Sequence, residues 1–222
     1  MNGFFLRSAG PDDLNDLVAL EHDVEQALPN REMFATDEKE FYEPIVRGAG
    51  HILLAFDTTG KLAGVSVIRF PSADDPENLG RELSLPRERL LAVRHLESVF
   101  VRPDIRGQHL AEKLVRENMK RTQENGRTLS MATVWPGNAA SLKLHLNLGL
   151  RVRGFAFKYG GKPRLILMDS GTIAENAAPL AVHAMDFEGH RARLRAGMAG
   201  IAVQVMPNQH DFFVEYKPLI QA

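Results

Sequence analysis

Hydrophobic and polar positions alternate along much of the chain in the way that β-strands require. We expect strands over residues 4–9, 51–57, 62–70, 94–101, 128–134, 150–159 and 164–168. Other stretches repeat hydrophobic residues at helical spacing. One begins at Pro11 and carries Leu14 and Leu17, and others run over 37–47 and from 110 to about 125. Helices that alternate with strands in this way predict a mixed α/β sheet with helices on its faces.

The segment 138–150 fits both patterns. Every second residue from 142 to 148 is a leucine, which is typical of a strand. However, the segment contains no β-branched residue, Asn138 is a good N-cap, and Gly149 can adopt the left-handed conformation that ends many helices. We therefore predict a helix that begins at Asn138.

Two parts of the chain fall outside the regular alternation. Residues 71–93 are charged and rich in turn-forming residues, and we expect a partly helical surface insertion there. The last part predicts a linker over 171–181, a helix over 186–196 and a hairpin of 201–206 with 212–217. We predict a main domain over 1–170 and a C-terminal extension over 171–222. Since about fifty residues rarely hold a core alone, the extension should pack on the main domain or on a second subunit of a homodimer.

Composition narrows the class of protein. The 222 residues are 44% hydrophobic, which is enough for one sizeable core. The 27 basic and 28 acidic residues give a net charge of −1 with no basic stripe, so we expect no nucleic-acid partner. No apolar run reaches membrane-spanning length and the N-terminus lacks a signal-peptide pattern, so we expect a soluble, cytoplasmic protein with no membrane partner. The chain has no cysteine and its histidines lack ligand spacing, so we expect no metal.

The most informative stretch is 99–111, which reads Val-Phe-Val-Arg-Pro-Asp-Ile-Arg-Gly-Gln-His-Leu-Ala. An apolar strand runs through a short polar turn into an amphipathic helix, on which Leu110 and Leu114 recur at helical spacing. The backbone N–H groups around Arg106 to Leu110 should therefore lie unpaired at a helix N-terminus, where the helix dipole favours negative charge. The turn predicts a phosphate site.

Strand, Arg-Gly turn and helix together resemble the coenzyme-A-binding segment of the GNAT superfamily of N-acetyltransferases, whose signature is Q/R-x-x-G-x-G/A. Gly107 is the first glycine of that signature. Asp104 stands where the family has Gln or Arg, and His109 stands where it has the second Gly or Ala.

A second segment, 138–150, is similar to the family's later helix, N-x-x-S-x-x-x-Y-x-x-x-G-F. Asn138, Ser141 and Gly149 occupy the matching positions, and His145 replaces the tyrosine. The two segments follow one another as in the family, and the resemblance covers about residues 4–169. It implies a GNAT fold, with a mixed, mostly antiparallel central sheet flanked by helices.

The resemblance also implies acetyl-CoA as cosubstrate. The cofactor-binding residues would be Val99, Val101, Arg106, Gly107, Gln108, His109, Leu110, Ala111, Asn138 and Ser141. Backbone groups of Val99 and Val101 would hold the pantetheine arm and polarise the thioester carbonyl. The side chains alone fit an ordinary core strand equally well, and helix capping explains Asn138 and Ser141 nearly as well.

Two residues are candidate catalysts. Glu97 precedes Val99 by two residues, so strand alternation places both on one face. The resemblance implies that Glu97 removes a proton from the incoming ammonium group and that His145 protonates the departing sulfur. Alternatively, Glu97 is a solvated strand carboxylate or the partner of Arg94 or Arg102, and His145 is an ordinary hydrogen-bonding residue of its helix.

The sequence predicts direct transfer of an acetyl group from acetyl-CoA to a primary amine, with a small molecule as acceptor. A protein N-terminus or lysine side chain is the alternative acceptor within the same chemistry. A non-catalytic acyl-CoA-binding sensor is the alternative from another class, because His109 and the missing tyrosine would then indicate lost chemistry.

Overall fold

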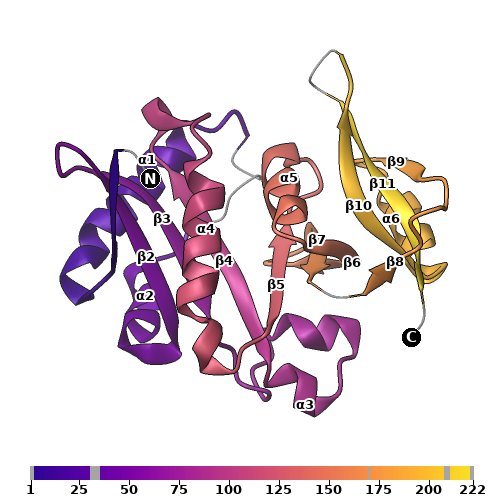
Figure 1. Cartoon of the computed structure of the whole chain (residues 1–222), viewed down its shortest axis with the longest axis horizontal. Coiled ribbons are helices and arrows are strands. Elements are labelled where there is room, and N and C mark those ends of the chain that lie inside the picture. Colours follow the sequence, from indigo (N-terminus) through magenta and orange to yellow (C-terminus); the bar gives the residue numbers. More distant parts are fainter. Residues whose placement is uncertain (1–2, 31–35, 170, 208–210, 221–222) are drawn as a thin grey trace. The chain divides into compact units, whose positions relative to one another are not determined.

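The computed structural model describes residues 3–30, 36–169, 171–207 and 211–220 (Figure 1). The chain forms two compact units. The first comprises Met1–Asp75 and Leu91–Thr128, and the second comprises Pro76–Leu90 and Leu129–Ala222. No helix among the described residues is long and apolar enough to cross a membrane.

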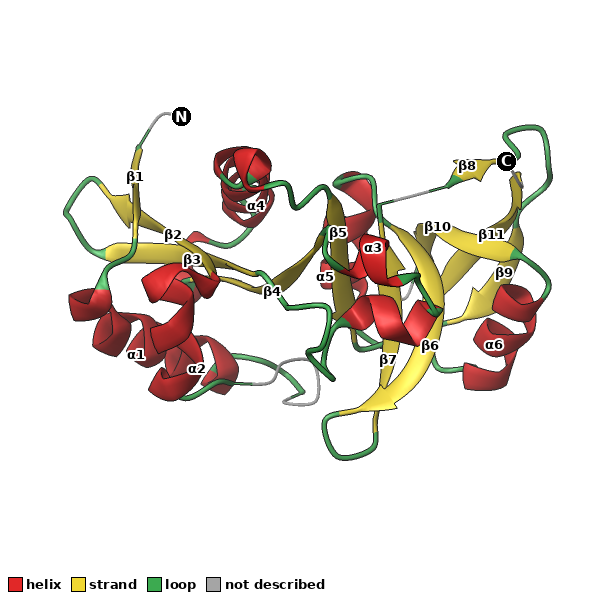
Figure 2. Ribbon diagram, turned by 90° about the horizontal axis from the view of Figure 1, so that it is seen from below, coloured by secondary structure: helices red, strands yellow, loops and turns green. Residues whose placement is uncertain are grey.

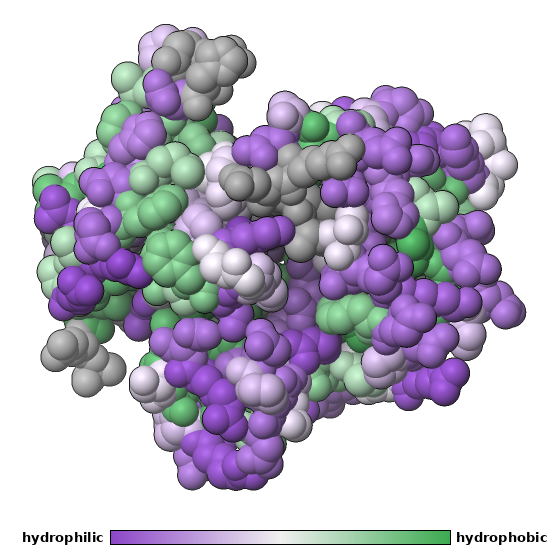
Figure 3. Space-filling model, turned by 180° about the vertical axis from the view of Figure 1, so that it is seen from behind, coloured by the Kyte–Doolittle hydropathy of each residue, from purple (hydrophilic) through white to green (hydrophobic). Residues whose placement is uncertain are grey.

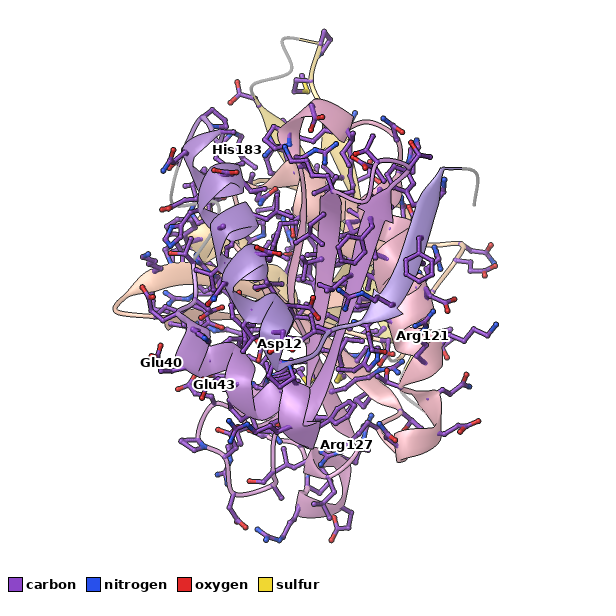
Figure 4. The ribbon with its side chains drawn as sticks, turned by 90° about the vertical axis from the view of Figure 1, so that its left-hand side faces the viewer. Asp12, Glu40, Glu43, Arg121, Arg127 and His183 are labelled. Atoms are coloured by element: carbon purple, nitrogen blue, oxygen red, sulfur yellow. The ribbon has the colours of Figure 1, made fainter. Side chains whose placement is uncertain are left out.

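The first unit is a β-sheet with helices on both faces. Its strands follow the order of the chain, each antiparallel to the next: β1 (Phe4–Ser8), β2 (Gly50–Asp57), β3 (Leu62–Arg69) and β4 (Val93–Val101). Its helices are α1 (Leu14–Gln26), α2 (Lys39–Pro44), which continues as a π-helical turn over Ile45–Ala49, and α4 (Leu110–Arg121). Figure 2 shows α1 and α2 on one face of this sheet and α4 on the other. In Figure 4, Glu40 and Glu43 mark α2 and Arg121 marks the end of α4 across the sheet.

Each face of this sheet has its own core. Under α1 and α2 the buried side chains include Leu17, Val65 and Phe100, and under α4 they include Val101 and Leu114. Burying such a side chain contributes about 1.5–3 kcal/mol. The two cores therefore determine which face of each strand turns toward which helix.

Strand β4 contains a β-bulge at Glu97. Ser98 pairs with Val67 and Leu96 pairs with Ile68, so Glu97 has no partner of its own in β3. An extra residue of this kind interrupts the alternation of faces along a strand.

The bulge overturns the expectation that Glu97 and Val99 share a face. Glu97 contacts Arg69, which lies on the α1–α2 face of β3. Val99 lies opposite Ser66, whose hydroxyl accepts a hydrogen bond from Asn118 of α4. The simple period of two fails here because one additional residue separates the two halves of the strand.

The second unit is built on a sheet in the order β5, β7, β6, β10, β11. These strands are β5 (Leu129–Val134), β7 (Lys162–Met168), β6 (Arg151–Lys158), β10 (Met198–Val205) and β11 (Phe212–Ile220). The short strands β8 (Thr172–Ile173) and β9 (Leu180–His183) both pair with β11. Its helices are α3 (Arg87–Leu90), α5 (Ala139–Asn147) and α6 (Phe187–Arg195).

The segment 138–150 forms the predicted helix. The side chain of Asn138 caps α5 by accepting a hydrogen bond from the backbone N–H of Ser141 at 3.0 Å. Gly149 follows the helix with φ +96°, a conformation that glycine adopts without strain. Capping signals therefore decide this segment, and the alternating leucines do not.

The C-terminal extension continues the sheet of the second unit. Gly200 of β10 pairs with Val152 of β6, and the ring centroids of Phe155 and Phe187 lie 5.4 Å apart. The segment 171–181, expected as a linker, contains β8 and the start of β9. The boundary at residue 170 stays a prediction, and the compact units divide the chain elsewhere.

Most large hydrophobic side chains exposed by the described residues belong to the second unit: Phe157, Tyr159, Leu180, Met185, Val205, Met206 and Ile220, against Phe5 and Leu91 in the first. In Figure 3 the hydrophobic patches are accordingly more frequent over the second unit, on the left. Such surface can be covered by a partner chain, and the predicted packing on a second subunit stays a prediction.

Candidate active site

The turn that precedes α4 is open and exposed. Residues 103–105 form a 3₁₀ turn, after which Gly107 has φ +82° and His109 has φ 57° and ψ 21°. A Cβ built at Gly107 would meet no atom within 4 Å. The left-handed conformation of His109 is one that glycine adopts more easily, which agrees with the glycine that the family signature allows at this position.

The backbone N–H groups of this turn lack acceptors within the described part of the chain. No backbone or side-chain oxygen there accepts from the N–H groups of 107–111, and His109 makes no side-chain cap. A helix N-terminus with such groups attracts anions. The turn is held at its start by Arg102, which donates to Asp57 at 2.8 Å and to Asp104 at 2.7 Å. These contacts do not engage the N–H groups of residues 107–111.

A second polar group lies on the α1–α2 face of the same unit. Arg69 donates from Nε to Glu97 at 2.5 Å and from Nη1 to Asp75 at 2.5 Å, and its Nη2 lies 3.0 Å from Nδ1 of His95. Glu97 therefore pairs with Arg69, and among the described residues neither Arg94 nor Arg102 donates a hydrogen bond to it. The structure also brings Glu97 and His95 together, with Nδ1 of His95 3.2 Å from Oε1 of Glu97.

Asp37 lies beside this group, just before α2. Its backbone N–H donates a hydrogen bond to Oε2 of Glu21 at 3.4 Å. The other oxygen of that carboxylate, Oε1, accepts from the Tyr42 hydroxyl at 2.8 Å. Glu21 and Tyr42 are fully buried. This buried pair ties the start of α2 to α1 and thereby places Asp37 near Glu97 and Arg69.

The two carboxylates differ in basicity. Burial and, after it, the charge of Glu97 raise the pKa of Asp37 to about 6, against the opposing charge of Arg69. Burial would also raise the pKa of Glu97, but the hydrogen bonds and charges of His95 and Arg69 outweigh it and hold that pKa at about 2. Asp37 is therefore much the stronger base at neutral pH.

Helix α5 of the second unit carries Asn138, Ser141 and His145. His145 is buried, and its Nδ1 donates to the backbone oxygen of Ser141 at 2.8 Å. In the neutral ring this leaves Nε2 as an acceptor. Burial lowers the pKa of His145 below its usual value, against the hydrogen bond to Ser141, so the neutral ring is favoured.

A family model described as the acetyltransferase (GNAT) family matches residues 15–150, which is more than half of the chain. The chain belongs to this family. The turn with Gly107, the strand with Glu97 and the helix with His145 all lie inside the matched range.

Among curated relatives, this GNAT protein is 37% identical over 65 residues to an L-methionine sulfoximine/L-methionine sulfone acetyltransferase of Pseudomonas aeruginosa. The match covers 29% of this chain and 38% of that relative.

Solved structures share the fold. A ribosomal-protein-alanine N-acetyltransferase from Brucella melitensis superposes with a TM-score of 0.52 at 23% identity, over 74% of this chain and 98% of that one. A phosphinothricin acetyltransferase from Sinorhizobium meliloti, solved in complex with AcCoA, gives a TM-score of 0.52 at 17% identity, over 75% and 87% of the two chains.

Sequence reasoning missed Asp37 and Arg69. Arg69 lies one residue before the end of an expected strand and Asp37 begins an expected helix, so neither position carried a motif. Only the fold brings them to Glu97.

Proposed function

We propose that this GNAT protein transfers an acetyl group from acetyl-CoA directly to a primary amine of a small molecule. The observation that carries the proposal is the turn 106–111, in which the backbone N–H groups of residues 107–111 lack acceptors in the described structure and open space lies over Gly107. A pyrophosphate of coenzyme A fits such a turn because the groups are donors at a helix N-terminus. Backbone groups of Val99 and Val101 would hold the pantetheine arm.

The acceptor amine must lose a proton before it attacks the thioester. We assign this step to Asp37. A carboxylate with a pKa of about 6 is ionised at neutral pH and still takes up a proton more readily than Glu97, whose pKa is about 2. Among the described residues, no hydrogen bond reaches the Asp37 carboxylate, whereas Glu97 is held by Arg69. Glu97 would then hold the ammonium by charge.

The departing thiolate needs a proton or a hydrogen-bond donor. His145 stands at the family's tyrosine position and is our candidate for this role. Its buried, neutral ring must first be protonated to act as an acid, so this step should be favoured below neutral pH. The chain has no cysteine to form a thioester intermediate, which agrees with direct transfer.

The small-molecule acceptor is supported by the names of two similar proteins. One is an L-methionine sulfoximine/L-methionine sulfone acetyltransferase, and the other is a phosphinothricin acetyltransferase. All of these names denote small molecules.

The test is release of the coenzyme A thiol from acetyl-CoA in the presence of small amines, L-methionine sulfone among them, and of peptides with a free N-terminus or a lysine. Turnover on a small amine and none on the peptides supports the proposal. Turnover on peptides alone contradicts the small-molecule acceptor. Binding of acetyl-CoA without turnover on any amine would instead support a sensor.

A further inference from the structure

Three polar side chains on the α4 face of the first unit form a chain of hydrogen bonds that the acetyl transfer does not use. The hydroxyl Oγ of Ser8 lies 2.8 Å from Nε2 of His51, and Nδ1 of His51 lies 2.7 Å from Oδ1 of Asn118. They come from β1, β2 and α4. We propose that Ser8 is a nucleophile, activated by His51 and positioned through Asn118, that reacts with small esters bearing a good leaving group.

The orientation of the Asn118 amide is fixed by its other contacts. Asn118 is fully buried, and its Nδ2 donates to the backbone oxygen of Ser66 at 2.8 Å and to the Ser66 hydroxyl at 3.2 Å. With the nitrogen committed to these acceptors, the oxygen Oδ1 faces His51. Leu110, Leu114 and Asn118 recur at every fourth position of α4, so the helix itself turns this amide toward the sheet.

The amide in turn fixes the tautomer of His51. Because Oδ1 can only accept, Nδ1 of His51 must carry the hydrogen. In the neutral ring Nε2 is then unprotonated and accepts the hydrogen bond from the Ser8 hydroxyl. A nucleophile, a base and a group that orients the base are thus arranged in the order that activates serine in acyl transfer.

Ser8 is accessible, whereas the group that orients its base is not. The Ser8 side chain is exposed at the end of the edge strand β1, and Asn118 is buried beneath α4. A reagent can therefore reach the Ser8 hydroxyl without disturbing the hydrogen bonds that join Ser8, His51 and Asn118.

The surroundings of Ser8 limit the acyl donors that can react. The backbone N–H of Ala9 donates to the Ile52 oxygen at 2.9 Å, and that of Gly10 donates to Asp13 at 2.8 Å. These groups cannot stabilise an oxyanion at Ser8, since they are already engaged. We therefore expect slow, stoichiometric acylation by activated aryl esters and little turnover.

The acylation of Ser8 by an aryl ester needs no further reactant. Oγ of Ser8 attacks the acyl carbon, Nε2 of His51 takes the hydroxyl proton, and the bond from the acyl carbon to the aryl oxygen breaks. The phenolate leaves with the electron pair and receives the proton from His51. The products are acyl-Ser8 and a phenol.

The experiment treats the full chain with p-nitrophenyl acetate, follows nitrophenolate release and locates the acetyl group by peptide mass spectrometry. We expect one equivalent of acetyl on Ser8, none there in Ser8→Ala, and a rate lowered by about 100-fold in His51→Gln. His22→Gln is the matched control, because His22 lies in the same unit and its Nδ1 lies 4.0 Å from Oε2 of Glu25. It should leave the rate unchanged.

Acetyl groups found only at other positions, or equal rates for wild type and His51→Gln, overturn the proposal. Should His51→Gln fail to fold, ¹⁵N NMR of the wild-type His51 ring decides instead. A hydrogen on Nδ1 that moves to Nε2 in Asn118→Leu, but not in Asn118→Asp, supports the positioning role, and a hydrogen on Nε2 of the wild type contradicts it. Acetyl transfer from acetyl-CoA should continue in Ser8→Ala, so the two proposals fail separately.

Discussion

Arg69 donates from Nε to Oε1 of Glu97 at 2.5 Å, whereas among the described residues no hydrogen bond reaches the carboxylate of Asp37. Against the effect of burial, His95 and then Arg69 hold the pKa of Glu97 at about 2, whereas burial and the charge of Glu97 raise the pKa of Asp37 to about 6. The fold thus gives these two carboxylates different pKa values, so that Asp37 takes up a proton more readily than Glu97.

Asp37→Asn should lower kcat with a small amine by about 100-fold or more, because a general base contributes about that much. In the wild type, kcat/KM should fall as the pH falls through about 6, since the base must be ionised. This acid limb should disappear in Asp37→Asn and persist in Glu97→Gln. Asp12→Asn, at an exposed position labelled in Figure 4, is the control. A limb near pH 6 that survives in Asp37→Asn would exclude this role.

Gly107→Val should abolish stabilisation by acetyl-CoA. In the wild type, acetyl-CoA at about 100 times its Kd should add about 2.7 kcal/mol to the free energy of unfolding. A side chain at Gly107 would block the approach of a pyrophosphate to the backbone. Gly126→Val is the matched control, because Gly126 also has positive φ (+69°) and open space over its Cβ position. Both variants should lose about 1–2 kcal/mol of stability from the left-handed backbone, but only Gly107→Val should lose the thermal shift. Equal shifts in the two would show that the cofactor binds elsewhere.

Glu21→Gln should flatten the dependence of stability on pH. Burial raises the pKa of Glu21 to about 7 in the folded protein, against 4.5 as its ordinary value. The folded state therefore holds a proton that the unfolded state releases. The contribution of protonated Glu21 to the free energy of unfolding is fully present below about pH 4.5 and is lost as the pH rises through about 7. The full loss is about 3 kcal/mol. Gln cannot titrate but can still accept from Tyr42. Chemical denaturation at several pH values measures the slope, with the exposed Glu40→Gln as control, and an unchanged slope in Glu21→Gln would refute the assignment.

His145→Ala should lower kcat by about 100-fold while acetyl-CoA binding barely changes, if the imidazolium protonates the thiolate. Since burial lowers the pKa of His145, the activity that depends on it should fall as the pH rises through a value below 6.5. His145→Tyr should recover part of the loss. Near-normal kcat for His145→Ala across the pH range would leave His145 only its hydrogen bond to Ser141.

Ending the chain at residue 170 should cause aggregation or a changed oligomeric state. The truncation removes the partner of Val152 in β10 and the ring of Phe187 from Phe155, which leaves an open strand edge and apolar surface. Size-exclusion chromatography measures this, with a chain ending at residue 220 as control. A monodisperse, equally stable protein would show that the extension is dispensable.

Local signals in the sequence were sufficient for most elements. The cap at Asn138 and the glycine at 149 identified α5, and the Arg-Gly turn located the start of α4. These features depend on a few adjacent residues. Interactions between distant segments left no such mark in the sequence. The charge of Glu97 acts on Asp37 in a fold where the hydrogen bond from Tyr42 to Glu21 joins α2 to α1.

The bulge at Glu97 was also invisible in the sequence, because no residue type is required at that position. Asn118 did carry a signal, as a polar residue on the stripe formed by Leu110 and Leu114. A buried amide in such a stripe needs partners, which indicates a polar network under the helix.

The extra residue in β4 gives deletion and substitution at Glu97 different consequences. Replacing Glu97 changes one charge and leaves every other side chain of the strand on its present face. Removing the residue would make Leu96 and Ser98 consecutive, opposite Ile68 and Val67, so the other side chains of β4 would keep their faces while the bulge and its local bend would be lost. The bend in β4 thus depends on the number of residues in the strand and not on the charge at position 97.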